Sequence, residues 1–522
     1  MHLKSEGTFY ITTPIYYVND APHIGHAYTT IAADILARYK RLEGYQVFFL
    51  TGTDEHGQKV EKAAQERGVD PKAHCDEMVK RFQSLWQRLN ISNNDFIRTT
   101  ETRHKTVVQK VLQGLYDRKE VYLDSYEGWY CVPCERFWTE KDLTEGKCPD
   151  CLRSVIEISE KNYFFRMSKY QSWLIEHIDR NDRFILPLSR RNEILGFLRT
   201  PLEDLCISRP KKRLKWGIEI PFDTDYVTYV WFDALINYIS GMGFGSENNH
   251  FSQFWPEAIH LIGKDILTTH TVYWPTMLKA IGLTPPKMVF AHGWWTIEGK
   301  KMSKSLQNVV EPNRLIDTYG ADAVRYFLVR EVPFGMDGDF SHSAMVHRIN
   351  SDLANDLGNL FSRTLSMVIK YFDGVIPNPL SLQEIDRGLQ EVSGKVFSQL
   401  SEQMEYLAFN KALVSIWEIV NASNKYIDET GPWFLAKEEK DRPRLATVLY
   451  HALESLRLIA LLLTAFMPST AEKMWLQLGI EENLWEQNLK ENGKWGGLKP
   501  GRKVAKPSPL FPRIDLSKIS FE

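Results

Sequence analysis

The stretch 9–40 constrains this chain most, because its pattern predicts a buried strand followed directly by a helix. Aromatic and β-branched residues fill 9–17, and apolar residues recur at helical spacing over 27–40. The tetrapeptide His23-Ile24-Gly25-His26 stands where that helix begins. A helix N-terminus presents unpaired N–H groups and the positive end of its dipole, and two imidazoles add donors for phosphate oxygens. The tetrapeptide therefore predicts a nucleotide-phosphate site, with a loop carrying two solvated histidines as the alternative.

A second basic motif, Lys301-Met302-Ser303-Lys304-Ser305, stands far along the chain and follows Gly299. Two lysines three residues apart in such a loop can reach the outer phosphates of a bound nucleotide. As mobile point charges they can also follow charge as it develops during a reaction at phosphorus. A lysine pair alone is weak evidence, but the two motifs together favour nucleotide chemistry.

The largely apolar run 45–53 is typical of a central parallel strand, and Asp54 stands at its carboxyl end. In open parallel sheets ligands bind outside the carboxyl ends of the strands, so Asp54 can meet the amino group of a substrate. The alternative is that Asp54 caps the next helix, and its position alone does not separate the two. The following segment, 57–120, has the pattern of packing helices.

Two later stretches, 226–240 and 260–275, repeat the change from strand to helix. The second opens its helix with Gly263-Lys264-Asp265 and shows His270 and Trp274 on one helical face. We expect both stretches to close the second half of the sheet and to line the same crevice. The alternative for the aromatic residues is ordinary core packing.

Four of the six cysteines form two C-x-x-C pairs, Cys131/Cys134 and Cys148/Cys151. Four thiolates at this spacing predict one tetrahedral Zn²⁺ that holds together an insert too small for its own core. A site filled by four cysteines has no open position for a catalytic water, so the zinc is expected to be structural. Free thiols in a loop are the alternative.

A basic run over 184–216 includes Arg190, Arg191, Arg199, Arg209 and Arg213. Such a run is either a solvated face or a surface that contacts an RNA acceptor stem. From about residue 347 the pattern is helical without strands, which predicts a separate bundle. The Pro-containing segment 497–522 is expected to cross back over the body as an extended strap.

The net charge of −2 means that any RNA contact must come from local patches. The N-terminus lacks an apolar signal region, and the aliphatic run 458–467 is too short to span a bilayer. Clustered cysteines, with Cys75 and Cys206 apart as buried thiols, are typical of metal binding in a reducing compartment. We therefore expect a cytoplasmic protein.

Together the HIGH and KMSKS motifs resemble the signature pair of class I aminoacyl-tRNA synthetases. Further motifs are similar to those of the methionyl-tRNA synthetase family: TPIYYVN at 13–19, TGTDEHG at 51–57, YVWFDA at 229–234, GKDI at 263–266 and NLFSR at 359–363. The resemblance implies an α/β fold, with a Rossmann-type parallel-sheet catalytic domain split by the zinc-binding insert and followed by an α-helical anticodon-binding bundle. The implied segments are 1–120 (first half, HIGH), 121–215 (insert), 216–290 (second half), 291–346 (KMSKS and stem contact), 347–496 (helical domain) and 497–522 (strap).

The resemblance also implies roles for individual residues. The methionine pocket would consist of Ile15, Tyr17, Trp231, Leu235, Tyr238, Ile266, His270 and Trp274, with Asp54 on the α-ammonium. ATP would contact His23, Gly25, His26, Gly263, Asp265 and Lys304, and His23, His26, Lys301 and Lys304 would be catalytic. Asn359, Arg363 and Trp433 would read the CAU anticodon; without the resemblance, a solvated helix face and packing would explain them. Methionine is flexible and polarizable, so an aromatic pocket suits it, and Tyr17 or His270 can donate a hydrogen bond to the thioether.

The implied reaction converts L-methionine and ATP, with Mg²⁺, to methionyl-adenylate and then charges tRNA(Met) for translation initiation and elongation. Positioning and stabilisation of phosphate charge would suffice, because no protein nucleophile is needed. The cysteines allow one structural zinc. Because the chain stops just past the strap, we expect a monomer without an appended dimerisation domain, and no membrane partner.

Four alternative functions are weighed against this one. A synthetase for leucine, isoleucine or valine would carry an editing insert of domain size, for which 121–215 leaves no room. One for cysteine is expected to hold zinc inside the substrate crevice rather than in an insert. A catalytically dead RNA-binding paralogue would not need both phosphate motifs and Asp54. A stand-alone nucleotidyltransferase would leave the helical domain without a task.

Overall fold

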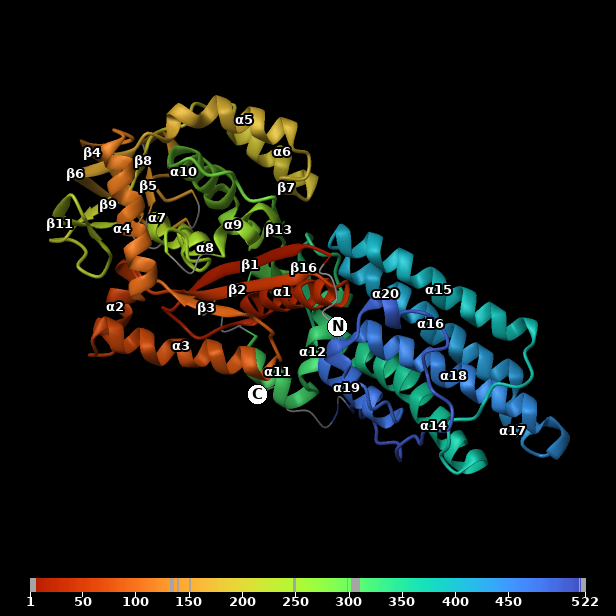
Figure 1. The fold of residues 1–522 in the computed structure, drawn as a ribbon. Coiled ribbons are helices and arrows are strands. Elements are labelled where there is room, and N and C mark those ends of the chain that lie inside the picture. The colour runs from red at the N-terminus through yellow and green to blue at the C-terminus, as the bar shows by residue number, and fades with distance from the viewer. Residues whose placement is uncertain are drawn as a thin grey trace.

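The computed structural model describes residues 6–131, 136–138, 140–149, 152–246, 250–297, 299–301, 310–515 and 517. Its centre is a six-stranded sheet in the order β3-β2-β1-β12-β13-β7, with every neighbouring pair parallel (Figure 1). The strands are β1 (Thr8–Tyr17), β2 (Gln46–Asp54), β3 (Asp95–Arg98), β7 (Ile185–Leu186), β12 (Ala258–Gly263) and β13 (Met288–His292). The predicted parallel α/β sheet is therefore confirmed.

The strand order reverses between β1 and β12. After β1 the chain builds β2 and β3 on one side, whereas β12 and β13 extend the sheet on the other side. A crevice opens outside the carboxyl ends of strands at such a switch point, and ligands of open parallel sheets bind there. The connection from β1 into α1 (Ile24–Leu42) therefore lies at the edge of the sheet where a substrate is expected.

Helix α1 is buried on almost all of its faces. It packs on β1 and β2 and also contacts α12 (Ala321–Arg330), so it lies between the sheet and the C-terminal half of the chain. The remaining helices of the sheet half are α2 (Gln58–Glu66), α3 (Pro71–Arg88), α4 (Thr102–Asp117), α5 (Gln171–Arg180), α6 (Leu188–Phe197), α7 (Val230–Leu235), α8 (Asn237–Ser240), α9 (Phe251–Phe254) and α10 (Trp274–Ile281).

Two sequence predictions about the sheet were wrong. The segment 57–120 is not helical throughout, because β3 interrupts it as a four-residue edge strand, too short to give a clear strand pattern. The strand expected within 226–240 is β11 (Asp223–Thr228), and it does not join the main sheet. It pairs with β9 (Ser208–Pro210) and β10 (Glu219–Ile220) in a small antiparallel sheet, and β7 takes the outer position of the main sheet instead.

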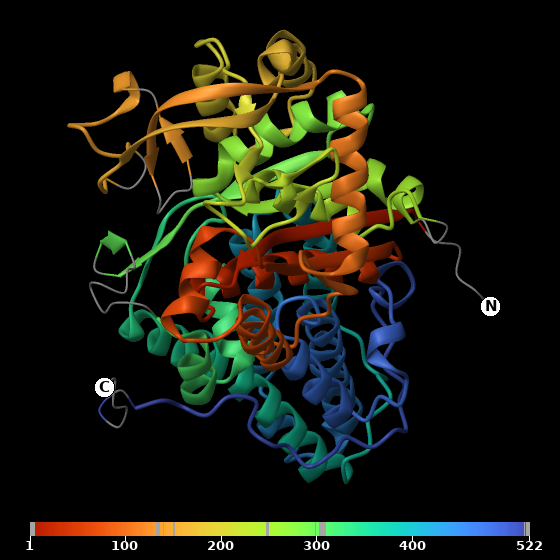
Figure 2. The same ribbon diagram turned by 90° about the vertical axis from the view of Figure 1, so that its left-hand side faces the viewer.

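The insert between the halves of the sheet is an antiparallel sheet in the order β5-β4-β6-β8. Its strands are β4 (Val121–Cys131), β5 (Arg136–Trp138), β6 (Ile156–Phe165) and β8 (Leu205–Cys206). Figure 2 shows the β4–β6 hairpin, in orange, reaching away from the central sheet. A further small sheet follows β13: β14 (Trp295–Ile297) pairs antiparallel with β15 (Lys300–Lys301) and parallel with β16 (Gly338–Phe340).

The C-terminal half is helical. After α11 (Pro312–Tyr319) and α12 come α13 (His342–Arg348), the π-helical η7 (Ile349–Gly358), α14 (Asn359–Phe372), α15 (Glu384–Glu405), α16 (Phe409–Thr430), α17 (Pro432–Leu435), α18 (Arg442–Leu463), α19 (Pro468–Gln477) and α20 (Leu489–Asn492). The stretch Glu439–Leu463 is long and apolar enough to cross a membrane, but its apolar window is wholly buried as a core helix of this bundle. After Gly497 the chain lies extended along the bundle, where Gly501 and Arg502 bond to the backbone of Ile376.

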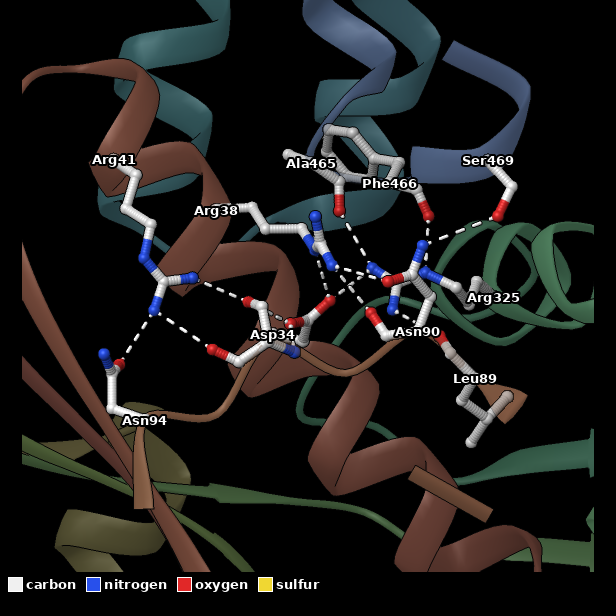
Figure 3. Close-up of polar contacts among 11 residues, drawn as sticks. Asp34, Arg38, Arg41, Leu89, Asn90, Asn94, Arg325, Ala465, Phe466 and Ser469 are labelled. Atoms are coloured by element: carbon white, nitrogen blue, oxygen red, sulfur yellow. Dashed lines mark hydrogen bonds and ion pairs between the residues drawn. The ribbon is translucent and has the colours of Figure 1, made fainter. Parts of the chain in front are cut away.

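A buried polar cluster joins the two halves (Figure 3). Arg325 of α12 pairs with Asp34 of α1 at 2.7 Å and donates to the carbonyls of Leu89, Ala465 and Phe466. Arg38, one turn after Asp34, donates to the same carboxylate at 2.8 Å. Burial alone raises the pKa of Asp34, but Arg38 and Arg325 outweigh it and lower the pKa to about 2. The helix that begins at HIGH is thereby tied to the α18–α19 turn.

Candidate active site

A cavity of about 420 Å³ opens at the switch point of the sheet. The ends of four strands reach it: β1, β2 at Asp54, β12 at Gly263 and β13 at His292. From the first half of the chain it is lined by Pro14, Ile15, Tyr16, Tyr17, His23, Gly25, His26, Tyr28, Thr29, Asp54 and Lys59. From the second half it is lined by Val230, Trp231, Ala234, Leu235, Asn237, Tyr238, Gly263, Asp265, Ile266, His270, His292, Gly293, Trp294 and Trp295.

The two histidines of HIGH are held by the backbone of the helix start. The His23 side chain accepts from the Gly25 N–H through Nδ1 at 3.1 Å, and His26 Nδ1 accepts from the His23 N–H at 3.2 Å. The two rings stack with centroids 3.8 Å apart. This reciprocal cap satisfies two of the unpaired N–H groups at the helix start and fixes both side chains.

Burial keeps both imidazoles neutral, and the same two hydrogen bonds determine which nitrogen of each ring carries the proton. Burial lowers the pKa of His23, and burial followed by the neighbouring His23 lowers the pKa of His26 well below its usual value. Both rings are therefore neutral at physiological pH. Because each Nδ1 accepts a backbone N–H, the proton of each ring is on Nε2, which leaves an N–H donor for an acceptor such as a phosphate oxygen.

A hydrogen-bonded pair closes the second half of the cavity. His270 Nδ1–H donates to the carbonyl of Ile266 at 2.9 Å, so Nε2 accepts the hydroxyl proton of Tyr238 at 2.8 Å. Burial lowers the pKa of His270 to about 4, which keeps the ring neutral. His270 lies in a π-helical turn, Thr269–Tyr273, a feature often found at functional sites. Both ring nitrogens of His270 are thus occupied in this structure.

Helix α7, which carries Trp231 and Leu235, is anchored by a buried carboxylate. Asp233 accepts from His56 Nδ1 and from His104 Nε2, each at 2.6 Å. Burial raises the pKa of Asp233, but the two histidines outweigh this and lower it. Since His56 follows β2 by two residues, the anchor holds α7 against the strand end that presents Asp54.

At the β12 end, the carboxylate of Asp265 lies close to the backbone of Gly263. A Cβ added there would lie 2.6 Å from Oδ1 of Asp265. The same carboxylate accepts from Trp294 Nε1 at 2.9 Å, so its orientation is set within the structure. Lys264 points elsewhere: it pairs with Asp337 at 2.6 Å and lies 4.2 Å from the centre of the Trp294 ring.

Several residues of the cavity were not predicted from the sequence. Lys59 lies on the first turn of α2 with its ammonium 5.1 Å from the centre of the Tyr17 ring. Its only sequence signal is its position five residues after Asp54, the carboxylate at the end of a strand. His292 is also in the lining and contacts Thr29 Oγ1 at 2.7 Å across the switch point.

Some predicted residues lie outside the cavity or outside the described residues. Trp274 does not line the cavity; it is fully buried with its ring 6.0 Å from that of Tyr238. The backbone of Lys301 ends β15, which pairs with β14. Lys304 lies outside the described part of the chain.

The three predicted anticodon residues lie in the helical domain. Asn359 is exposed where η7 gives way to α14, and Arg363 lies one turn later. Arg363 bonds to Asp428 at 3.0 Å and to Asn424 at 3.1 Å, both near the end of α16. Trp433 follows on α17 and is 39% exposed, which leaves ring surface for a partner.

Two of the four predicted zinc ligands can be located. Cys131 ends β4, and the carbonyl of Cys148 accepts from the Leu152 N–H; both cysteines are buried. Cys134 and Cys151 lie outside the described residues. Among the residues that are described, no three His, Cys, Asp or Glu side chains gather as a metal site. Two buried cysteines, one from each C-x-x-C pair, fit thiolate ligands of zinc.

The predicted basic face over 184–216 is not continuous. Arg209 is buried on β9, where its guanidinium lies 4.5 Å from the centre of the Tyr229 ring and donates to the Ser208 carbonyl. Arg213 pairs with Glu160 at 2.8 Å. For Arg209, neither a solvated face nor an RNA contact applies, because all three residues of β9 are buried.

Comparisons with known proteins agree with this geometry. Residues 9–157 and 153–365 match the family described as tRNA synthetases class I (M), and residues 376–520 match the anticodon binding domain of methionyl tRNA ligase. A methionine–tRNA ligase of Caldanaerobacter subterraneus subsp. tengcongensis is 54% identical over 98% of this chain and 80% of its own length. That of Thermotoga maritima is 48% identical over 97% of this chain and 80% of its own. A solved structure of Mycobacterium tuberculosis methionyl-tRNA synthetase in complex with methionyl-adenylate has a TM-score of 0.93 and 42% identity, covering 97% of this chain and all of that one.

Proposed function

The chain belongs to the class I methionyl-tRNA synthetase family, and from that premise we propose how its residues divide the reaction among them. The reaction is the ATP-dependent activation of methionine followed by charging of tRNA. The observation that carries our assignment is a single cavity that joins the imidazole donors of HIGH to an aromatic pocket and to Asp54.

Methionine binds at the aromatic part of this cavity, with Asp54 on its α-ammonium. Asp54 supports this role because it ends β2 at the cavity and its side chain is nearly buried, so its charge suits a buried cation. The walls are Ile15, Tyr17, Trp231, Leu235, Tyr238, Ile266 and His270. Tyr17 and His270 were the two donors expected for the thioether, but both ring nitrogens of His270 are bonded to Ile266 and Tyr238. Contacts between the polarizable sulfur and the aromatic rings therefore contribute more to recognition of the thioether.

ATP binds at the HIGH end. The Nε2–H groups of His23 and His26 donate to phosphate oxygens, and Gly25 at the start of α1 allows close approach. Gly263 and the oriented carboxylate of Asp265 receive the ribose hydroxyls. The histidines are well suited because they are neutral and already fixed, so they lose little freedom when ATP binds.

In the first step a carboxylate oxygen of methionine attacks the α-phosphorus. The bond from the α-phosphorus to the bridging oxygen breaks, and its electron pair leaves with pyrophosphate. Lys301 and Lys304 stabilise the charge that develops on the departing phosphates, and Mg²⁺ bound with ATP supplies further positive charge. In the second step a terminal adenosine hydroxyl of tRNA attacks the acyl carbon, and AMP leaves.

The anticodon is read by residues of the helical domain. Trp433 offers a stacking surface, while Asn359 and Arg363 offer hydrogen bonds to base edges. The anchoring of Arg363 by Asp428 and Asn424 supports this, because an oriented guanidinium reads a base edge with less loss of freedom.

The remaining assignments concern the zinc insert, the cellular location, the oligomeric state and the segment boundaries. One structural Zn²⁺ on Cys131, Cys134, Cys148 and Cys151 would hold the insert, and metal analysis of the purified protein tests this. We assign the protein to the cytoplasm as a monomer, with the segment boundaries inferred above. The anticodon-domain match begins at residue 376, inside the bundle that we begin at 347.

The test is ATP–pyrophosphate exchange with each standard amino acid in the absence of tRNA. We expect exchange with methionine alone. Exchange with another amino acid would keep the chemistry and overturn the pocket. No exchange with any amino acid would contradict the catalytic assignment and favour an RNA-binding paralogue.

A further inference from the structure

His260 on β12 lies directly behind the pocket, outside the cavity lining. Its side chain is fully buried. The His260 and Tyr238 rings stack with centroids 4.1 Å apart and planes 24° from parallel. One face of the Tyr238 ring is thus covered by an imidazole rather than by an aliphatic side chain, and an imidazole is a costly group to bury unless its nitrogens are bonded.

Both nitrogens of His260 are bonded, which determines its tautomer. The indole N–H of Trp274 can only donate, so His260 Nε2 accepts it, at 3.2 Å. Nδ1 then carries the proton and donates to Thr12 Oγ1 at 2.8 Å. Burial and the nearby His270 lower the pKa of His260 well below its usual value, so the ring stays neutral. These two bonds fix the plane of the ring between β1 and α10.

Tyr238 is held at two further points. Its carbonyl accepts from the Tyr10 hydroxyl at 2.7 Å, and its own hydroxyl donates to His270. Those bonds fix the backbone and the tip of the side chain. The stack with His260 fixes the plane of the ring, which forms a wall of the cavity.

We propose that His260 is a positioning residue for methionine recognition, which sets the plane of Tyr238, and that Trp274 acts on the pocket through His260. The proposal rests on the function proposed above. It gives Trp274 a role although that residue does not line the cavity. We call the contacts from Trp274 through His260 to Tyr238 the relay. Because the relay reaches only the methionine end of the cavity, its loss should weaken methionine binding and leave ATP binding unchanged.

The first variant is His260→Phe, which keeps a flat ring but removes both hydrogen bonds. In ATP–pyrophosphate exchange we expect KM for methionine to rise roughly tenfold, since a small misplacement of a binding group is costly, with KM for ATP unchanged. The preference for methionine over norleucine, expressed as the ratio of kcat/KM values, should fall. A purely structural role would instead change the KM values of both substrates or only lower Tm.

A double-mutant cycle tests the relay itself. Trp274→Phe alone should raise KM for methionine, because His260 Nε2 loses its donor. Added to His260→Phe it should have little further effect, since the bond through which it acts is already absent. Fully additive effects of the two substitutions would refute the relay.

A matched control is His451→Phe in the helical domain. His451 is equally buried, with Nε2 bonded to Gln390 at 3.0 Å and Nδ1 to the Thr447 carbonyl. It should leave KM for methionine unchanged. If His260→Phe does not fold, His260→Gln, which can still accept from Trp274, should show the same methionine-specific rise. An unchanged KM in the folded His260 variant overturns the proposal, whereas wild-type protein without methionine exchange overturns the proposed function itself.

Discussion

Arg325→Met would cut the buried connection between the two halves of the chain (Figure 3). The wild-type guanidinium is fully buried, pairs with Asp34 and donates to three carbonyls, those of Leu89, Ala465 and Phe466. Methionine has a similar length but offers no donor. The variant therefore leaves a carboxylate with one fewer cation and three carbonyls without this partner.

The size of the destabilisation depends on the bonds that Asp34 keeps in the variant. Breaking a buried ion pair by removing one partner costs about 3–5 kcal/mol, because the other charge is left inside. Asp34 keeps Arg38 and two bonds from Ser92, so the cost belongs at the lower end of that range. The lost carbonyl bonds add about 1 kcal/mol each. We expect a total destabilisation of about 6 kcal/mol. The unfolding entropy of a chain of 522 residues is about 1.1 kcal/mol per kelvin, so Tm should fall by roughly 5 °C.

The assay is thermal unfolding followed by circular dichroism, with Arg103→Met as the matched control. Arg103 also makes two ion pairs, with Asp95 and Glu101, but it is exposed. Exposed pairs contribute at most about 1 kcal/mol, so this control should melt close to the wild type. If Arg325→Met melted within a degree or two of the wild type, the apolar replacement would have compensated for the network, and the reasoning above would be refuted.

Three further predictions concern the reaction and its pH range. Lys304→Ala should severely lower pyrophosphate exchange while calorimetry still detects methionine binding; undiminished exchange would remove Lys304 from the mechanism. Trp433→Ala should weaken tRNA charging but spare exchange, and an equal loss of both would make Trp433 a packing residue. Because the pKa of Asp34 is lowered from 3.8 to about 2, its contribution to stability is complete above pH 3.8 and is lost as the pH falls toward 2. Acid unfolding of Asp34→Asn should therefore show a weaker pH dependence in this window, and an identical profile would contradict the assignment.

The local features of the site were readable in the sequence because each rests on neighbours along the chain. HIGH stands at a strand–helix junction that periodicity alone predicts, and its reciprocal cap needs only residues 23 to 26. Asp54 at a strand end and Gly263-Lys264-Asp265 after a strand likewise follow from short patterns. The confirmed resemblance to the family rests on the same short motifs.

Other features depended on contacts between distant segments. β3 pairs too briefly to show a strand pattern, and the sheet that β11 joins is decided by its partners β9 and β10. Nothing near Lys59 in the sequence indicates that it lies beside Tyr17, and Arg209 within a basic run gives no sign of burial.

By itself the sequence determined the family and the parallel α/β sheet with its helical bundle, and it located the HIGH and KMSKS motifs. Only the tertiary structure decided that Trp274 lies behind Tyr238, that His260 stacks on that ring, and that Arg325 reaches Asp34. The physical reason is separation: hydrophobic period and turn chemistry act over a few residues, whereas these bonds join residues brought together only when the core closes. The donors and acceptors of these bonds cannot be recognised in the sequence, because a buried polar group can pair with a partner from any part of the chain.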